Sequence, residues 1–402
     1  MIDSKSVGRL VRLKISKTTE RKIRKGYPWV FDYQLRSQPD PVVPAGLGVI
    51  YDSTNRFLAL GLYDPNSPIR MRILQSEGPT SIDEEFFRHR LERAWEAREF
   101  LKEKSCDGFR VVNGENDGLP GLILDCYGET LVAKIYTAAW FFFLPKIERH
   151  LGFGGKIKRC VLRLSRNISD KVYYDGKVLF GSPISEPTVF WENGLKFQAD
   201  VLSGQKTGFY FDQRDNRQHI RGMARDKTIL NVFSYTGAFS IYAFAGGCKS
   251  VLEIDYNPHA LRMSRANLKL NFPELLEDVE RFTQIQGDAF ELLNKLDGKN
   301  MKFDLVILDP PAMASGKRHK LRALDAYERL ARMGARITKP GGFLFAASCS
   351  RPIKGQEFFA AVRRGIGATG RRGKEFLKTG HALDHPITFE EGIYLKAVFW
   401  SL

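Results

Sequence analysis

The sequence predicts an α/β protein whose C-terminal half forms an open, doubly wound parallel sheet. From about Phe190 onward, strand patterns and helix patterns alternate at the spacing of βαβ units. Two of these strands are short, continuous apolar runs bounded by turn residues, as expected for strands buried on both faces. The chain has 402 residues, which is too long for one ordinary core, so two or three domains are expected.

Composition restricts the partners and the compartment. The formal net charge of +16 favours a polyanionic partner such as a nucleic acid, although an inert basic surface is the alternative. The five cysteines are odd in number and scattered, so neither a disulfide framework nor a metal site is predicted. The chain contains no signal-peptide pattern and no apolar run of membrane-spanning length. We therefore expect a cytoplasmic protein without a membrane partner.

Residues 1–75 are predicted to form a small, all-β, RNA-binding module. Alternating strand patterns at 9–15, 48–51, 57–63 and 69–73 follow one another at hairpin spacing. Nine basic residues lie between Lys5 and Lys25, and only Glu20 opposes them. A solvated charged face is the alternative, but this excess favours contact with phosphates. The candidate RNA-binding residues in this module are Arg9, Lys22, Arg24 and Lys25.

Residues 76–187 are predicted to form a middle domain of α+β type. A helix is expected to begin at Ser81, whose hydroxyl would cap it with Glu84 three residues later. Strand patterns and turns follow, and the proline-containing stretch 183–187 is the expected joint to the last domain.

Residues 188–402 are predicted to form the doubly wound domain. It opens with a hairpin at 188–191 and 195–198. Strands are then expected at 229–233, 251–255, 283–287, 303–309, 343–348 and 393–400. Helices are expected at 238–245, 258–270, 290–296, within 321–337, and at 356–364.

The end of the first of these parallel strands has the features of a cofactor site. A turn with a single glycine follows it, and Asp255 ends the next strand about twenty positions later, where a nucleotide ribose is commonly held. The missing glycines argue against a dinucleotide, whose pyrophosphate needs close backbone approach, and favour S-adenosylmethionine. A helix cap is the alternative role for Asp255. The candidate cofactor residues are Phe233, Ser234, Tyr235, Gly237 and Asp255, with Asp288 facing the adenine amine.

Two chemically active side chains follow neighbouring apolar runs. Asp309 ends one run and Cys349 ends the next, so both are expected at the carboxyl edge of the sheet, where ligands gather. A thiol and a carboxylate delivered together suggest a nucleophile and a proton-handling partner, as methylation of a pyrimidine carbon requires. The other four cysteines are interpreted as buried structural residues. For Asp309, a helix cap is the alternative.

A second basic stretch follows Asp309-Pro310-Pro311. Lys317 and Arg318, with Lys320 and Arg322, could bind backbone phosphates near an unstacked base, or could form a merely solvated loop.

With these segments placed, the chain resembles the bacterial 23S ribosomal RNA cytosine-C5 methyltransferases that carry an N-terminal PUA domain. The matching stretches are 26–31, 114–121, 204–217, 233–237, 309–311, 348–350, 384–386 and 394–396. The resemblance implies a PUA-like barrel, a middle domain and a class I, S-adenosylmethionine-dependent methyltransferase domain with a Rossmann-like sheet. Cys349 would attack C6 of the base, and Asp309 would contact the N3 edge. Thr207 and Gln213, in the matching stretch 204–217, are further cofactor candidates.

The chain departs from the family pattern at three places. Arg351-Pro352 stands where the family often has histidines, an insert occupies 272–282, and Ala312 stands where some cytosine-C5 enzymes have a second cysteine. The alternatives are a guanine-N7 or other N-methyltransferase, which needs no thiol, and a ribosome-assembly factor with an idle cofactor fold. The sequence does not specify the target cytosine or the group that removes the C5 proton. It also does not specify whether the substrate is naked RNA or an assembled subunit, or whether the protein forms a homodimer.

Overall fold

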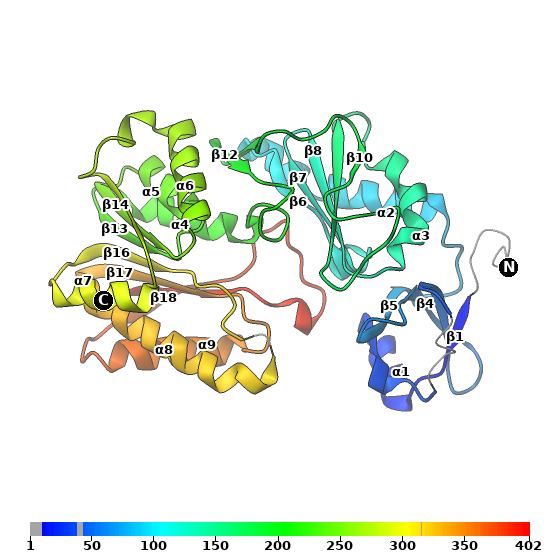
Figure 1. Ribbon diagram of the computed structural model, residues 1–402. Helices are drawn as coiled ribbons and strands as arrows, with labels where there is room; N and C mark the ends of the chain where they lie inside the picture. The colour runs from blue at the N-terminus through cyan, green and yellow to red at the C-terminus, as the bar shows by residue number, and fades with distance from the viewer. Residues whose placement is uncertain (1–9, 38–42, 315) are drawn as a thin grey trace. The chain divides into compact units, whose positions relative to one another are not determined.

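The computed structural model describes residues 10–37, 43–314 and 316–402. The chain forms two compact units (Figure 1). The first contains Met1–Gly194, Ala199–Phe209 and Asp384–Gly392, and the second contains Leu195–Gln198, Tyr210–Leu383 and Ile393–Leu402. The division into 1–75, 76–187 and 188–402 stays a prediction, since residues up to Gly194 and the segments Ala199–Phe209 and Asp384–Gly392 pack with the first unit. Within the described residues, no helix is long and apolar enough to span a membrane.

The N-terminal part of the first unit is a five-stranded sheet in the order β1-β3-β4-β5-β2. Its strands are β1 Val11–Leu13, β2 Trp29–Phe31, β3 Gly46–Tyr51, β4 Phe57–Tyr63 and β5 Ile69–Gln75. The expectation that this module is all-β is wrong, because Lys17–Arg24 forms helix α1 and Asp32–Gln34 forms the 3-10 helix η1. The Ser16 hydroxyl caps α1 by accepting from the backbone N–H of Thr19 at 3.2 Å.

The remainder of the first unit is an α+β layer built on a second five-stranded sheet, in the order β10-β9-β8-β7-β6. Its strands are β6 Gly108–Asn113, β7 Leu122–Tyr127, β8 Thr130–Ile135, β9 Arg159–Leu164 and β10 Val178–Phe180. Helices α2 Glu84–Glu96 and α3 Trp140–Ile147 contribute the buried aromatic rings of Phe87 and Trp140 to the core. The predicted Ser81 cap is wrong, because Asp83 caps α2 by accepting from the Phe86 N–H at 3.0 Å.

Short 3-10 helices connect these elements: η2 Glu99–Lys104, η3 Gly114–Asp117 and η4 Glu148–His150. The predicted hairpin at 188–198 is confirmed, since β11 Thr188–Glu192 and β12 Leu195–Ala199 form a two-stranded sheet.

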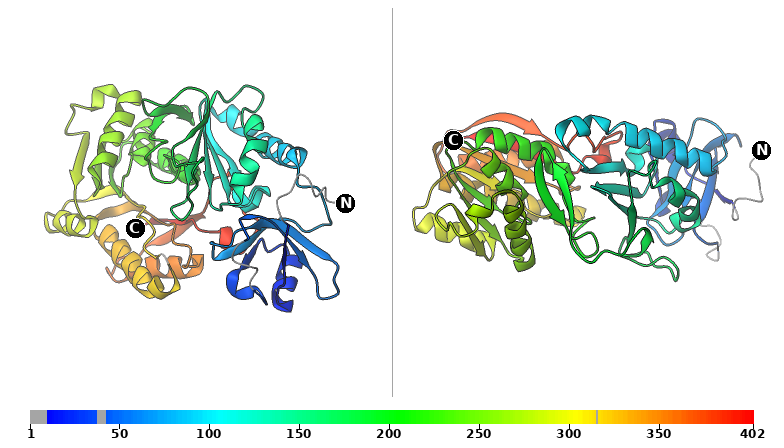
Figure 2. Two further views of the ribbon diagram at one scale, coloured as in Figure 1. Left: turned by 45° about the vertical axis from the view of Figure 1, so that its right-hand side comes forward. Right: turned by 90° about the horizontal axis from the view of Figure 1, so that it is seen from above.

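The second unit is a seven-stranded sheet in the order β15-β14-β13-β16-β17-β19-β18, with helices on both faces (Figure 1 and Figure 2). Its strands are β13 Thr228–Val232, β14 Ser250–Asp255, β15 Phe282–Gln286, β16 Phe303–Leu308, β17 Thr338–Ser348, β18 Lys374–Thr379 and β19 Lys396–Ser401. Its helices are α4 Arg214–Met223, α5 Ala238–Ala245, α6 Pro258–Asn271, α7 Ala289–Gly298, α8 Lys320–Ile337 and α9 Gly355–Gly367. The predicted doubly wound fold is therefore confirmed.

The direction of strand addition reverses between β13 and β16. The first five strands are parallel, and β19 runs antiparallel between β17 and β18. In such a sheet, a crevice opens outside the carboxyl ends of the strands where the order reverses. The loops after β13, β14, β16 and β17 meet at this edge.

Candidate active site

Asp309 and Cys349 follow adjacent parallel strands of the second unit. Leu308, the last residue of β16, pairs with Ala346 of β17, so Asp309 and Cys349 lie close to the same edge. Cys349 is partly exposed, whereas the other four cysteines are buried. A partly exposed thiol at a sheet edge has the access that a nucleophile requires.

Hydrogen bonds hold the loop that carries Cys349. Ser350 donates its N–H to Ser348 Oγ at 3.3 Å, and its own hydroxyl accepts from the N–H of Ala314 at 3.2 Å. The Ser350 hydroxyl also pairs with the hydroxyl of Tyr327, on α8, at 2.9 Å. Because both serines are fully buried, these bonds fix the backbone on either side of Cys349 and connect it to the loop after Asp309.

Tyr210 also lies at this edge, close to Asp309 and Cys349. It was not identified as a functional residue from the sequence. Burial raises the pKa of its phenol, and the nearby acidic groups, in decreasing order of effect, raise this pKa further: Tyr235, Asp212, Cys349 and Asp309. Its ring meets that of Tyr235 edge-on, with centroids 5.2 Å apart. Tyr210 therefore remains protonated and can act as a hydrogen-bond donor beside both predicted catalytic groups. Its place in the matching stretch 204–217 was the only sequence signal for it.

The turn after β13 is the candidate cofactor site. Phe233, Tyr235 and Gly237 have φ of +63°, +49° and +75°, in the left-handed region. Non-glycine residues rarely adopt this conformation, and such strain gathers at functional sites. The Asp255 carboxylate stabilises the turn, because its two oxygens accept from the N–H groups of Tyr235 and Asn257, each at 2.8 Å.

The polar groups of this turn fit a ligand with hydroxyl and amino groups. The hydroxyls of Ser234 and Thr236 are buried, and neither has a hydrogen-bond partner among the described residues. Each oxygen of Asp255 can accept a second hydrogen bond. Buried polar groups are normally satisfied, so a bound nucleoside would supply the missing partners.

Gly237 has a packing role in addition. A Cβ at this position would lie 2.0 Å from Ser264 Oγ and 2.8 Å from Glu253 Oε1. Only glycine therefore allows helix α6 to approach the turn this closely.

The remaining cofactor candidates are held by protein partners. Asp288 is exposed and caps α7, accepting from the N–H of Glu291 at 3.0 Å. Gln213 is buried and accepts from Asn216 Nδ2 at 2.6 Å. Thr207, in the first unit, donates to Asp125 Oδ2 at 2.5 Å and pairs with the Tyr127 hydroxyl at 3.0 Å.

The predicted RNA-binding residues of the N-terminal module differ in whether carboxylates neutralise their positive charge. Arg24, on α1, pairs with Glu20 at 3.1 Å and with Asp52 at 2.8 Å. Lys22 and Lys25 are exposed, and the Lys22 ammonium lies 5.5 Å from the centre of the Tyr27 ring.

Two of the other basic residues can be placed in the structure. Arg318 is exposed in the 3-10 helix η7, Lys317–His319. Lys320, the first residue of α8, forms an ion pair with Glu357 at 2.6 Å. Arg9 and the side chain of Lys317 lie outside the described part of the chain.

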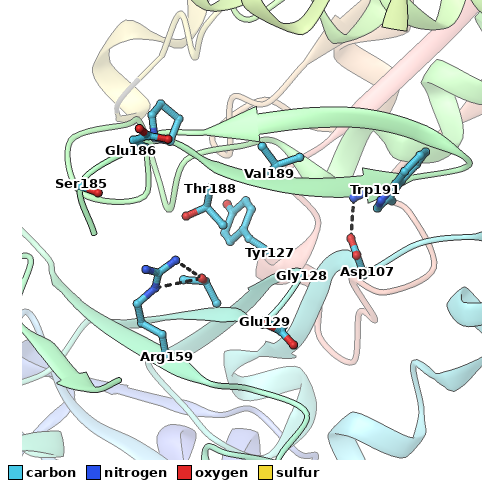
Figure 3. A pocket seen from close by; sticks show the side chains of 12 residues that line it. Asp107, Tyr127, Gly128, Glu129, Arg159, Ser185, Glu186, Thr188, Val189 and Trp191 are labelled. Atoms are coloured by element: carbon cyan, nitrogen blue, oxygen red, sulfur yellow. Dashed lines mark hydrogen bonds between the residues drawn. The ribbon is translucent and has the colours of Figure 1, made fainter. Parts of the chain in front are cut away.

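A polar pocket of about 420 Å³ lies in the first unit (Figure 3), and none of the predicted site residues lines it. The carboxylates of Asp107, Glu129 and Glu186 line it, together with Arg159, which donates to Thr130 Oγ1 at 3.2 and 2.8 Å. No cysteine lines this pocket, so it cannot supply the predicted nucleophile.

Comparison with known proteins decides the family. Residues 168–366 match the model of an S-adenosylmethionine-dependent methyltransferase, and residues 13–76 match that of a PUA-like domain. A ribosomal RNA large subunit methyltransferase of Deinococcus radiodurans is 42% identical over 401 residues, covering 98% of this chain and 97% of that protein. The chain belongs to this family of ribosomal RNA large subunit methyltransferases. The predicted family and its cofactor, S-adenosylmethionine, are confirmed.

Further relatives of this methyltransferase agree. Ribosomal RNA large subunit methyltransferase I of Aeromonas salmonicida is 34% identical, covering 95% of this chain and 97% of that protein. A solved structure from Streptococcus mutans, described as a SAM-dependent methyltransferase, has a TM-score of 0.83 and 20% identity. It covers 98% of this chain and 100% of the solved one, and at this identity it bears on the fold alone.

Proposed function

We propose that this chain transfers the methyl group of S-adenosylmethionine to C5 of a cytosine in 23S ribosomal RNA. The observation that carries this proposal is the partly exposed thiol of Cys349, which directly follows β17, the strand paired with β16, after which Asp309 comes. The names of the relatives support large-subunit ribosomal RNA as the substrate. Methyl transfer to a ring nitrogen needs no thiol at this position.

Cys349 is the nucleophile in this proposal. C5 of cytosine is a poor nucleophile until a group adds across the C5–C6 bond. The Cys349 thiolate forms a bond to C6, so C5 becomes enamine-like and accepts the methyl group. A base then takes the C5 proton, and the electrons of the C5–H bond restore the C5–C6 double bond as the Sγ–C6 bond breaks and the thiolate is released.

In this proposal, Asp309 and Tyr210 bind the polar edge of the base. Asp309 hydrogen-bonds to or protonates N3, which stabilises the negative charge that addition at C6 places on the ring. Tyr210 remains protonated and can donate a hydrogen bond to the same region. No metal is assigned to this step.

The β13 turn holds the cofactor in this proposal. Bound S-adenosylmethionine supplies an electrophilic methyl group. Asp255 binds the ribose, and Ser234 and Tyr235 in the turn provide further polar contacts. We also retain Phe233, Gly237, Asp288, Thr207 and Gln213 as cofactor-site residues in the proposal.

The RNA must present its cytosine as an unstacked nucleotide, because a stacked and paired base hides C6 from the thiolate. We assign phosphate contacts to exposed basic residues, namely Lys22 in α1, Lys25 directly after it and Arg318 in η7. Ribosomal RNA as partner implies a cytoplasmic site of action. A homodimer is not needed for this chemistry.

The test is to map modified bases in large-subunit RNA from cells that lack this protein. We expect one cytosine that resists bisulfite conversion in the wild type to become convertible in the deletion strain. Restoring the wild-type chain should restore resistance at the same position. Loss of a guanine-N7 methyl group instead would contradict the proposal, as would an unchanged modification pattern.

A further inference from the structure

The side chain of Lys396 is buried directly behind the loop that carries Cys349. Lys396 is the first residue of β19 and pairs with Ser348 in the antiparallel ladder of β17 and β19. The lysine is only 4% exposed. A lysine is rarely buried to this degree unless its ammonium group has a charged partner.

The hydrogen bonds of Lys396 supply no such partner. Its Nζ donates to the carbonyl oxygens of Ser350 at 2.7 Å and Tyr394 at 2.9 Å, both of which are neutral. No carboxylate forms an ion pair with Lys396 anywhere in the described part of the chain. Removing an ammonium from water is costly, so a nearby negative charge is expected.

Cys349 is the acidic group that acts on this ammonium. Burial lowers the pKa of Lys396 to about 8, and the negative charge of Cys349 acts in the opposite direction. Below this pH the amine is protonated, so it can stabilise a thiolate through the physiological range.

Four further titratable groups near Cys349 differ from Lys396, because they are neutral, acidic or exposed. Tyr210 and Tyr327 both have a pKa raised by burial, so both phenols stay neutral. Asp309, at the end of β16, is an acid and would oppose a second negative charge nearby. The guanidinium of Arg351 lies 5.9 Å from the centre of the Tyr394 ring. Because Arg351 is exposed, water screens its charge.

We propose that Lys396 is a positioning residue that keeps Cys349 in the thiolate form and fixes it at the carboxyl end of β17. This inference rests on the proposed function, in which Cys349 attacks C6. The thiol proton leaves to water, and the ammonium of Lys396 neutralises the resulting sulfur anion. The lysine thereby connects β19 to the nucleophile, and the pairing of β17 with β19 sets its position.

A purely structural role for Lys396 makes a different prediction. If the lysine only satisfied the carbonyls of Ser350 and Tyr394, a neutral donor of similar length would largely replace it. Lys396→Gln keeps a hydrogen-bond donor and removes the charge, whereas Lys396→Met removes both. A change in the ionisation of Cys349 in Lys396→Gln therefore reports the charge itself.

The experiment measures the rate of iodoacetamide alkylation of Cys349 against pH in the full-length protein. An opposite charge within a few ångströms lowers an acid's pKa by about 1–3 units, so the midpoint should rise by about 1–2 pH units in Lys396→Gln. Alkylation at pH 7 should then be at least about tenfold slower. Arg351→Gln is the matched control, since it removes an exposed charge two residues from Cys349, and its midpoint should stay at the wild-type value. An unchanged midpoint in Lys396→Gln overturns the proposal.

A second measurement needs no Lys396 variant and so does not depend on how that variant folds. The thiolate absorbance of the wild type, less that of Cys349→Ala, gives the ionisation of Cys349 beside the native lysine. We expect a midpoint below the ordinary thiol value of about 8.5, and a midpoint at or above it overturns the proposal.

Trapping with RNA containing 5-fluorocytidine separates the two proposals. If no adduct forms but the midpoint of Cys349 alkylation depends on Lys396, attack on C6 is overturned and the role of the lysine is supported. An adduct with a midpoint independent of Lys396 would overturn only the lysine's role.

Discussion

The carboxylate of Asp255 accepts a hydrogen bond from the backbone N–H of Tyr235 at 2.8 Å, and this bond joins the ends of β14 and β13. Tyr235 has a left-handed φ of +49°, a conformation that costs energy for a residue with a side chain. Asp255 therefore has two roles in our interpretation, since it stabilises the strained turn and also offers its remaining lone pairs to the cofactor.

Replacing Asp255 should weaken cofactor binding. We expect Asp255→Ala to reduce the affinity for S-adenosylmethionine by about 1.5–3 kcal/mol, because hydrogen bonds to a charged group are removed. Asp255→Asn keeps one oxygen that can accept from the turn, so its affinity should fall less. Calorimetry measures both, with a thermal unfolding scan as the check on folding. Unchanged affinity in Asp255→Ala would remove this residue from the site.

Gly237→Ala should destabilise the second unit through packing as well as backbone strain. The new Cβ would lie 2.0 Å from Ser264 Oγ, and the residue has a φ of +75°. We expect the free energy of unfolding to fall by about 2–4 kcal/mol, which combines overpacking with left-handed strain. Urea denaturation measures this.

Gly247→Ala is the matched control for that variant. Gly247 has a similar φ of +79°, but no atom lies within 4 Å of its built Cβ. Its cost should be only the backbone strain of about 1–2 kcal/mol. Adding Ser264→Gly to Gly237→Ala should recover part of the stability, and equal destabilisation in both alanine variants would contradict the packing role of Gly237.

The basic residues Lys22 and Arg24 of α1 and Lys25, which directly follows it, should differ in their contribution to RNA binding. Alanine at Lys22 and Lys25 together should weaken binding to large-subunit RNA fragments and reduce the slope of log K against log salt by about 1 for each phosphate that the protein no longer neutralises. Arg24→Ala should change that slope less, because Glu20 and Asp52 already neutralise this guanidinium. Filter binding at several salt concentrations measures both, and identical slopes in all three proteins would argue against phosphate binding by α1.

Sequence patterns predicted strands β16 and β17 well, because Leu305–Leu308 and Phe343–Ala347 are continuous apolar runs. The edge strand β18 was not predicted, since its exposed and partly buried residues alternate and it contains few apolar side chains. Helix α1 was also missed. It buries only Thr19 and Ile23, so its basic residues conceal the helical period, and the cap by Ser16 is its main local signal.

In the candidate site, residues that directly follow an apolar strand could be predicted, whereas residues placed by strand pairing could not. Asp309 and Cys349 could be predicted because each directly follows an apolar strand. Lys396 could not, because its position depends on the antiparallel register that sets it opposite Ser348, and hydrophobic periodicity does not specify which strands pair. Tyr210 lies outside any regular strand or helix, so only its neighbours in space reveal it.

The decisive substitution is Cys349→Ala. It should abolish methyl transfer while leaving S-adenosylmethionine binding intact, because the thiol acts on the base.

The other cysteines are buried, and burial raises the pKa of the Cys248 thiol to about 12, so it stays protonated near neutral pH. Alanine at any of these four should cost about 1 kcal/mol of stability and leave activity in place. RNA with 5-fluorocytidine at the target should form a covalent adduct with the wild type and none with Cys349→Ala, because fluorine cannot leave C5 as a proton does. A Cys349→Ala enzyme that still methylates its RNA would assign the reaction to a nitrogen atom and to a mechanism without a thiol.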